Sequence, residues 1–185
     1  MKLIILDRDG TINLDRDDFV KSADEWVPLP NALEAIAKLN QAGYTIAVAT
    51  NQSGIGRGLY DMAALNAMHD KMHRLLREAG GRVDAIFFCP HNPESGVEAC
   101  NCRKPLPGLF EQIRDRYGVD MTTVPTVGDT LRDLQAGAAL GCPTHLVCTG
   151  KSQLKVPANL PEGTHIHADL MVFANWLIAS SQKPI

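Results

Sequence analysis

The sequence lacks long apolar runs and lacks an excess of either charge. A membrane-spanning helix needs about 20 consecutive apolar residues, and none of the apolar runs approaches that length. The first residues, Met1 and Lys2, lead into a short apolar stretch and then into charged residues, unlike a signal peptide. The formal net charge is only -3 and the isoelectric point is near 6.0, so we expect no binding to nucleic acid or to a membrane. These absences favour a cytoplasmic protein.

The cysteines also lack the pattern of a disulfide framework. Five cysteines are an odd number, and they occur without a secretion signal. In such a chain, metal ligation is a better interpretation of clustered cysteines than disulfide bonding.

Apolar runs alternate with amphipathic stretches along the whole chain. This alternation is typical of α/β proteins, in which helices pack on both faces of a mainly parallel sheet. A length of 185 residues with 45% hydrophobic residues fits a single domain over residues 1–185. The spacing between strands leaves no room for a large cap domain. The predicted strands are residues 3–6, 44–49, 85–88, 124–127, 144–147 and 165–168, and the predicted helices are residues 30–43, 61–80, 107–117 and 170–179.

Two carboxylates, Asp7 and Asp9, directly follow the first predicted strand. Side chains two residues apart on an extended segment point the same way, so both could face a pocket at the carboxyl edge of the sheet. Such a pair could bind a hard cation, with one carboxylate acting as a nucleophile and the other as a proton shuttle. Asp-x-Asp-Gly is also the sequence of an ordinary turn, and the other strand ends decide between the two interpretations.

Two further strand ends and the long loop after the third strand carry matching chemistry. Thr50 supplies a hydroxyl at the end of the second strand, and the small polar residues after it could cradle a phosphate with backbone amides. Arg103 and Lys104 offer a forked donor beside a point charge, both suited to phosphoryl oxygens. Asp129 follows the fourth strand, and Mg²⁺ binds one or two protein carboxylates together with substrate oxygens. Together these residues predict a phosphoryl-transfer site.

The ordered set Asp7-Arg8-Asp9-Gly10-Thr11, Thr50, Lys104 and Gly128-Asp129 resembles the haloacid dehalogenase superfamily of phosphatases. The resemblance implies a Rossmann-like, three-layer α/β/α fold. It also implies an aspartyl-phosphate intermediate on Asp7, with Asp9 as acid and then base. Thr50 and Lys104 would hold the phosphoryl group, and Mg²⁺ would be bound by Asp7, Asp129 and the backbone carbonyl of Asp9.

A second cluster lies in the long irregular loop of residues 89–104. Cys89 and His91, followed by Cys100 and Cys102, provide the three thiolates and one imidazole that a structural Zn²⁺ accepts. The one-residue gaps are tighter than in most zinc modules, so buried or redox cysteines remain an alternative. A zinc ion would hold this loop in one conformation and so fix the position of Arg103 and Lys104.

With this loop included, the chain resembles the heptose-1,7-bisphosphate phosphatases and the related histidinol-phosphate phosphatases. The resemblance implies removal of the C7 phosphate of D-glycero-D-manno-heptose 1,7-bisphosphate in the synthesis of ADP- or GDP-heptose for lipopolysaccharide or another surface glycan. Histidinol phosphate is the alternative substrate. We expect a monomer that acts on a small phosphorylated sugar. The expected substrate-binding residues are Asp15, Asp18, Asn51, Gln52, Ser53, Arg57 and Arg103.

Other titratable residues are expected to be structural. His69 and His73 lie four apart on a predicted helix without a third ligand, which favours a solvated helix face. Cys142 and Cys148 lie beside apolar strands and are expected to be buried thiols. Two other functions also remain open: a receiver domain that keeps phosphate on an aspartate, and a zinc-stabilised binding module with an inactive pocket.

Overall fold

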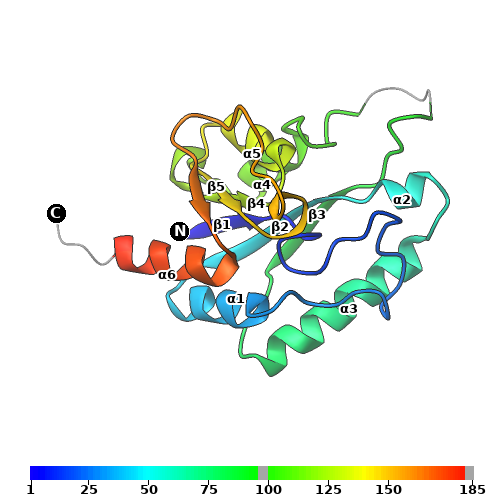
Figure 1. Cartoon of the computed structure of the whole chain (residues 1–185), viewed down its shortest axis with the longest axis horizontal. Helices are drawn as coiled ribbons and strands as arrows, with labels where there is room; N and C mark the ends of the chain where they lie inside the picture. The colour runs from blue at the N-terminus through cyan, green and yellow to red at the C-terminus, as the bar shows by residue number, and fades with distance from the viewer. Residues whose placement is uncertain (96–99, 182–185) are drawn as a thin grey trace.

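The computed structural model describes residues 1–95 and 100–181, and in this part of the chain six strands form one parallel sheet (Figure 1). The spatial order is β3-β2-β1-β4-β5-β6, so the chain starts in the middle of the sheet and builds each half in turn. Because every pair of neighbouring strands is parallel, all six strands end at the same carboxyl edge. The strands are β1 (Leu3–Leu6), β2 (Thr45–Asn51), β3 (Ala85–Cys89), β4 (Thr126–Gly128), β5 (Thr144–Val147) and β6 (His165–His167).

Helices cover both faces of this sheet, as the alternating pattern predicted. On β1, Ile4 and Leu6 join the core beneath α1 (Ala32–Gln41), α3 (Met62–Glu78) and α6 (Leu170–Ser181). Leu3 and Ile5 point to the opposite core, beneath α4 (Gly108–Tyr117) and α5 (Leu131–Ala138). Because consecutive strand residues face opposite sides, one apolar run supplies both cores. The predicted three-layer α/β/α fold is confirmed, and no described helix is long and apolar enough to cross a bilayer.

The helix boundaries follow local signals. The Asp61 side chain accepts the backbone N–H of Ala64 at 2.9 Å and caps α3, as its position predicted. Sequence periodicity did not predict α5 or α2 (Ser53–Gly56). Both are too short for an amphipathic repeat to emerge. Short 3-10 helices at Met121–Thr123 and Gly150–Ser152 complete the described elements.

Three histidines stack at the β5–β6 edge of the sheet. His145 Nδ1 lies 3.1 Å from His167 Nε2, and the His145 ring packs against Phe173 and Trp176 of α6. His165 stacks on the same ring, with centroids 5.4 Å apart. Burial, followed by the neighbouring His167, lowers the pKa of His145 to about 3. The folded protein therefore holds this imidazole neutral.

This histidine should make stability sensitive to acid. Since the folded-state pKa of His145 lies below its unfolded value, its contribution is complete above about pH 6.5 and is lost as the pH falls toward 3. Between about pH 7.5 and pH 5 this one group should reduce the free energy of unfolding by about 2 kcal/mol. Urea denaturation at both pH values should show a correspondingly smaller loss for His145→Phe. An equal loss in the two proteins would contradict this assignment.

Candidate active site

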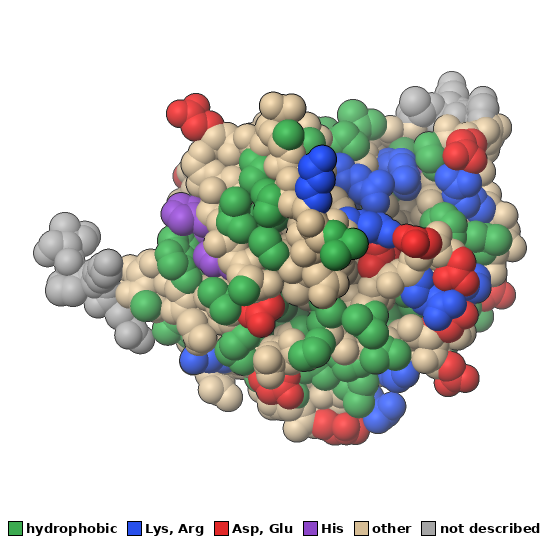
Figure 2. Space-filling view, in the orientation of Figure 1, with side chains coloured by type: hydrophobic (Ala, Val, Ile, Leu, Met, Phe, Trp, Pro, Cys, Tyr) green, Lys and Arg blue, Asp and Glu red, His purple; other side chains and the backbone are tan. Residues whose placement is uncertain are grey.

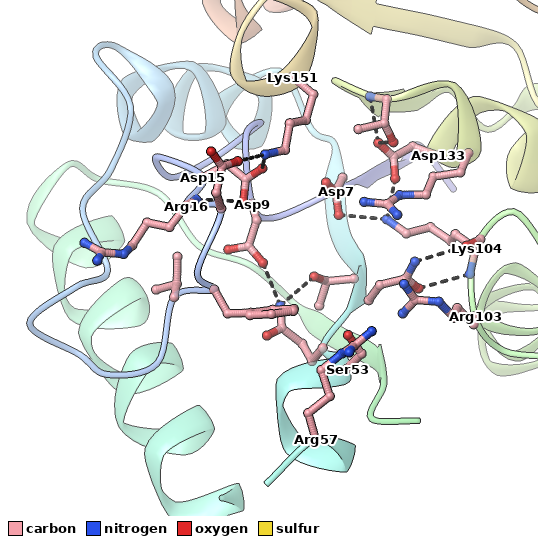
Figure 3. A pocket seen from close by; sticks show the side chains of 18 of the residues that line it. Asp7, Asp9, Asp15, Arg16, Ser53, Arg57, Arg103, Lys104, Asp133 and Lys151 are labelled. Atoms are coloured by element: carbon pink, nitrogen blue, oxygen red, sulfur yellow. Dashed lines mark hydrogen bonds and ion pairs between the residues drawn. The ribbon is translucent and has the colours of Figure 1, made fainter. Parts of the chain in front are cut away.

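The strand ends meet around one cavity at the carboxyl edge of the sheet. The cavity has a volume of about 270 Å³, and Asp7, Asp9, Thr50 and Lys104 all line it (Figure 3). The predicted catalytic residues, which come from distant parts of the sequence, are therefore brought together. Of the predicted substrate-binding residues, those that line the cavity are Asp15, Asn51, Gln52, Ser53, Arg57 and Arg103.

Lys104 is buried and joins two acidic residues to the backbone of β2. Its Nζ donates to Asp7 Oδ1 and to the Ala49 carbonyl, each at 2.7 Å. It also forms an ion pair with Asp133 Oδ1 at 2.7 Å. Burial alone would lower the pKa of Lys104, but the carboxylates of Asp133 and Asp7 raise it above its ordinary value. The Asn51 side-chain amide bonds both the N–H and the C=O of Lys104, at 3.0 and 3.1 Å. The backbone of Lys104 is therefore fixed as well as its ammonium group.

Three buried acidic residues, Asp7, Asp129 and Asp133, bring carboxylate oxygens within 4.8 Å of one another. Burial and the charge of Asp133 raise the pKa of Asp7 to about 7. Burial and the charge of Asp7 raise that of Asp129 to about 8. Among the described residues, Asp129 Oδ1 is buried without a hydrogen-bond donor. A hard divalent cation such as Mg²⁺ fits this oxygen-rich cluster, because it would relieve the repulsion and complete the coordination of that oxygen.

Two glycines let the backbone approach Asp129 closely. Gly10 has a φ of +85°, and a Cβ on Gly10 or Gly150 would overlap the Asp129 carboxylate. The next residue, Lys151, donates its backbone N–H to Asp129 Oδ2 at 2.7 Å. The segment after β5 therefore positions an acidic residue that follows β4, a contribution that the sequence analysis missed.

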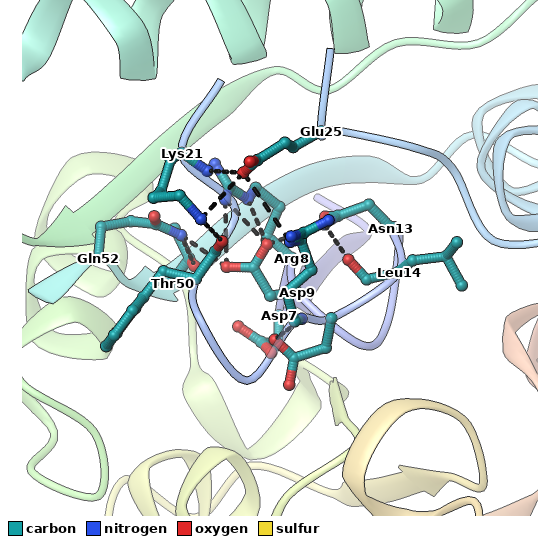
Figure 4. Close-up of polar contacts among 12 residues, drawn as sticks. Asp7, Arg8, Asp9, Asn13, Leu14, Lys21, Glu25, Thr50 and Gln52 are labelled. Atoms are coloured by element: carbon teal, nitrogen blue, oxygen red, sulfur yellow. Dashed lines mark hydrogen bonds and ion pairs between the residues drawn. The ribbon is translucent and has the colours of Figure 1, made fainter. Parts of the chain in front are cut away.

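Asp9 is fixed by three donors rather than by the acidic cluster (Figure 4). Arg8 bonds both carboxylate oxygens, with its Nη2 lying 2.8 Å from Oδ1 and 3.1 Å from Oδ2. Asn13 Nδ2 and Gln52 Nε2 each donate at 2.8 Å. Burial alone would raise the pKa of Asp9, but these donors, led by Arg8, lower it below its ordinary value. The structure therefore presents Asp9 as an oriented carboxylate.

The prediction of a solvated helix face is wrong for His69. This residue is buried, and its Nε2 lies 3.1 Å from Arg8 Nη1. Burial, followed by the positive charge of Arg8, lowers the pKa of His69 to about 3. A neutral imidazole thus accepts a hydrogen bond from the guanidinium that holds Asp9. Sequence periodicity could not reveal this contact, because Arg8 and His69 are 61 residues apart.

The segment of residues 15–18 contributes only in part. Lys151 Nζ pairs with Asp15 at 3.3 Å and with Asp17 at 2.6 Å across the cavity rim. Asp18 instead points to Arg16 and Lys21, at 2.9 and 3.0 Å, and does not line the cavity. The expectation that Asp18 contacts substrate is therefore not supported by its position.

Basic side chains surround the mouth of the cavity. Figure 2 shows Lys and Arg side chains around a hollow that contains acidic groups. Arg57 pairs with the exposed Glu94 at 2.8 Å, whereas Arg103 Nη1 is buried without an acceptor among the described residues. Burial and the nearby charge of Arg132 lower the pKa of Arg103. Such a rim favours an anionic ligand.

Several lining residues were missed by the sequence analysis. Arg132 lies in helix α5, which was not predicted, and Lys151 follows β5. Both come soon after a strand, so the argument that placed Asp129 at the carboxyl edge of the sheet would also have pointed to them. No local signal marked Val20 or Tyr60. The missed lining residues are Val20, Tyr60, Arg132 and Lys151, whereas Arg16 and Asp17 fall in the segment of residues 15–18 that was expected to line the site.

The four predicted zinc ligands also converge. His91 Nδ1 lies 3.3 Å from both Cys89 Sγ and Cys102 Sγ, and Cys89 Sγ lies 3.6 Å from Cys100 Sγ. Cys89, Cys100 and Cys102 form no disulfide bonds in the described part of the chain. Residues 96–99 of the predicted loop lie outside the described residues. Donor separations of about 3.3–3.8 Å are those expected around a tetrahedral zinc ion, so the cluster fits Zn²⁺.

Comparison with known proteins agrees with this geometry. A model of the haloacid dehalogenase-like hydrolase family matches residues 12–141. The D-glycero-beta-D-manno-heptose-1,7-bisphosphate 7-phosphatase of Bordetella bronchiseptica is 58% identical over 179 residues, covering 96% of this chain and 98% of that protein. The phosphatase of the same name from Pseudomonas aeruginosa is 53% identical over 176 residues, covering 95% and 97%.

A solved structure gives the same result at the level of the fold. The D,D-heptose 1,7-bisphosphate phosphatase from B. bronchiseptica, complexed with magnesium and phosphate, superposes with a TM-score of 0.93 at 57% identity. The alignment covers 97% of this chain and 99% of that one. Taken with the acidic cluster and the cavity, these matches mean that the chain belongs to the haloacid dehalogenase-like hydrolase family.

Proposed function

We propose that this chain is a magnesium-dependent phosphatase that removes the C7 phosphate of D-glycero-D-manno-heptose 1,7-bisphosphate. The observation that carries this proposal is the clustering of Asp7, Asp129 and Asp133, two of which pair with Lys104, beside a cavity with a basic rim. The names and the high identity of the relatives support the substrate. The product would enter the synthesis of ADP- or GDP-heptose for lipopolysaccharide or another surface glycan.

Asp7 is the nucleophile in this proposal. Its carboxylate oxygen bonds to phosphorus while the phosphorus–oxygen bond to the sugar breaks, and Asp9 gives a proton to the departing oxygen. Water then attacks the aspartyl-phosphate, passes a proton to Asp9 and displaces Asp7, which releases inorganic phosphate. The arriving phosphate adds negative charge beside Asp9, which favours the protonated form needed for the first step.

The surrounding residues neutralise the transferring group. Asp7, Asp129 and the backbone carbonyl of Asp9 would hold Mg²⁺. When bound, Mg²⁺ offsets the negative charge that the nucleophile and the phosphoryl oxygens share. Lys104 adds a fixed cation, and the buried Thr50 hydroxyl adds a donor.

The basic rim favours a bisphosphate over histidinol phosphate. Arg57 and Arg103 lie where a second phosphate would meet charge-assisted donors. Histidinol phosphate instead carries an amine whose positive charge would face these guanidinium groups. Asn51 and Gln52 line the same cavity, but their side chains already bond Lys104 and Asp9, so we assign them to positioning. Ser53, at the start of α2, is the better candidate for a substrate contact.

Zn²⁺ would stabilise the loop next to this site. Cys89, His91, Cys100 and Cys102 would hold it as a closed structural site. Because Arg103 and Lys104 directly follow Cys102, the ion would fix the point from which both basic residues enter the cavity.

We further propose that residues 1–185 act as a single-domain, cytoplasmic monomer. One continuous sheet supports the single domain. The exposed large apolar side chains come from many separate elements, which supports a monomer. A metal site built from cysteines that form no disulfide bonds is suited to a reducing compartment.

Substrate preference tests the proposed function. With Mg²⁺ present, kcat/KM for the heptose bisphosphate should exceed that for histidinol phosphate by about 100-fold or more, because each charge-assisted hydrogen bond contributes about 1.5–3 kcal/mol. A phosphate-release assay on both substrates measures this ratio. Equal activity on the two substrates, or preference for the amine, would overturn the substrate assignment.

The same phosphate-release assay on Asp7→Asn tests covalent catalysis by Asp7. Loss of the nucleophile should reduce turnover by at least about 1000-fold while the circular dichroism spectrum is unchanged. Asp115→Asn is a matched control, because Asp115 is exposed on α4 and, within the described part of the chain, pairs only with its neighbour Arg114. Turnover by Asp7→Asn at the rate of this control would refute covalent catalysis by Asp7.

Zinc content is a separate test. Elemental analysis of the purified protein should find about one zinc per chain. Cys102→Ser should lose most of this metal and raise KM, because the loop carrying Arg103 is released. Cys148→Ser should keep the zinc, since Cys148 lies outside the cluster. A zinc-free wild-type protein, or unchanged zinc in Cys102→Ser, would contradict the structural role.

A further inference from the structure

Gln52 links a tyrosine at the cavity wall to the two polar groups that act on the phosphoryl group. Its Nε2 donates to Asp9 Oδ2 at 2.8 Å and to Thr50 Oγ1 at 2.9 Å (Figure 4). On the other side of the amide, Oε1 accepts the hydroxyl of Tyr60 at 2.5 Å. Both polar atoms of the Gln52 amide are thus committed within the protein.

The chemistry of these groups fixes the direction of the amide. An ionised carboxylate only accepts hydrogen bonds, so the NH₂ side of Gln52 must face Asp9. If the amide turned over, Oε1 would face the carboxylate and two acceptors would repel each other. The hydroxyl of Tyr60 opposes this by giving Oε1 a donor of its own. Burial raises the pKa of Tyr60 to about 12, so this donor stays protonated at neutral pH.

Tyr60 is itself held by packing. It lies between α2 and α3 and lines the cavity. Its ring lies so close to Gly54 of α2 that a Cβ on this glycine would overlap it. The backbone of α2 therefore fixes the position of the Tyr60 ring and hydroxyl. The hydroxyl in turn fixes the orientation of the Gln52 amide.

We propose that Tyr60 is a positioning residue for proton transfer, which acts through Gln52 to aim the Asp9 carboxylate. This inference rests on the proposed function, since it requires Asp9 to protonate the leaving oxygen.

The test compares substrates whose leaving groups need a proton to different degrees. A sugar alkoxide leaves poorly without protonation, whereas p-nitrophenolate leaves readily. Tyr60→Phe should lower kcat/KM for the heptose bisphosphate about tenfold, but should lower that for p-nitrophenyl phosphate by no more than about twofold. A purely structural role would lower both by the same factor, and that result would overturn the proposal. Tyr117→Phe, the same change on α4 and outside the cavity lining, should affect neither.

A double-mutant cycle isolates the route through Gln52. In a Gln52→Ala background, adding Tyr60→Phe should change kcat/KM by less than about twofold, because no amide remains to be oriented. An additional loss of about tenfold in that background would show independent effects and overturn the proposal.

Asp9→Asn separates this inference from the proposed function. This variant should lose far more activity on the heptose bisphosphate than on p-nitrophenyl phosphate. If Asp9→Asn shows no such difference, the proposed acid role of Asp9 fails, and the inference fails with it. If Asp9→Asn shows the difference and Tyr60→Phe does not, only the inference about Tyr60 fails.

Discussion

Repulsion among three buried carboxylates is the constraint on which the site depends. Asp7, Asp129 and Asp133 lie too close together, and too far from water, to be ionised at once without nearby positive charge. Lys104 supplies one charge and pairs with two of the three. Burial, together with the neighbouring carboxylates, still raises the pKa values of Asp7 and Asp129. The repulsion among these carboxylates destabilises the fold. Binding of a divalent cation would offset this cost, which explains why the cluster stands at the end of the central strands.

The parallel sheet makes this concentration of charge possible. Its carboxyl edge gathers the ends of β1, β2 and β4, while the buried cores on both faces hold those strands rigid. The less regular segments are fixed by particular contacts. Asn51 clamps the backbone of Lys104, the Cys-His cluster lies just before it, and glycines at positions 10 and 150 admit the backbone beside Asp129. Catalytic geometry is therefore distributed over several loops, each held by contacts of its own.

Much of this arrangement could be predicted from the sequence. Asp7, Asp9, Thr50 and Asp129 stand at or just after strand ends, and parallel strands bring such ends together whatever their separation in sequence. Close spacing in the sequence also pointed to the Cys-His cluster. What could not be predicted depends on tertiary contacts. His69 looked solvated because helical periodicity does not reveal a buried arginine beneath it. The roles of Tyr60 and Lys151 likewise depend on loop paths, and the helix carrying Arg132 is too short for a periodic signal.

The most direct test of the central constraint is thermal unfolding with and without Mg²⁺ in wild type and in Asp129→Asn. At a Mg²⁺ concentration of about 100 times Kd, linkage should stabilise the wild type by about 2.7 kcal/mol. Without Mg²⁺, Asp129→Asn should be at least as stable as wild type, because one repelling charge is removed, and added Mg²⁺ should barely change its Tm. An equal Mg²⁺ response in the two proteins, or none in wild type, would contradict a cluster built around a cation.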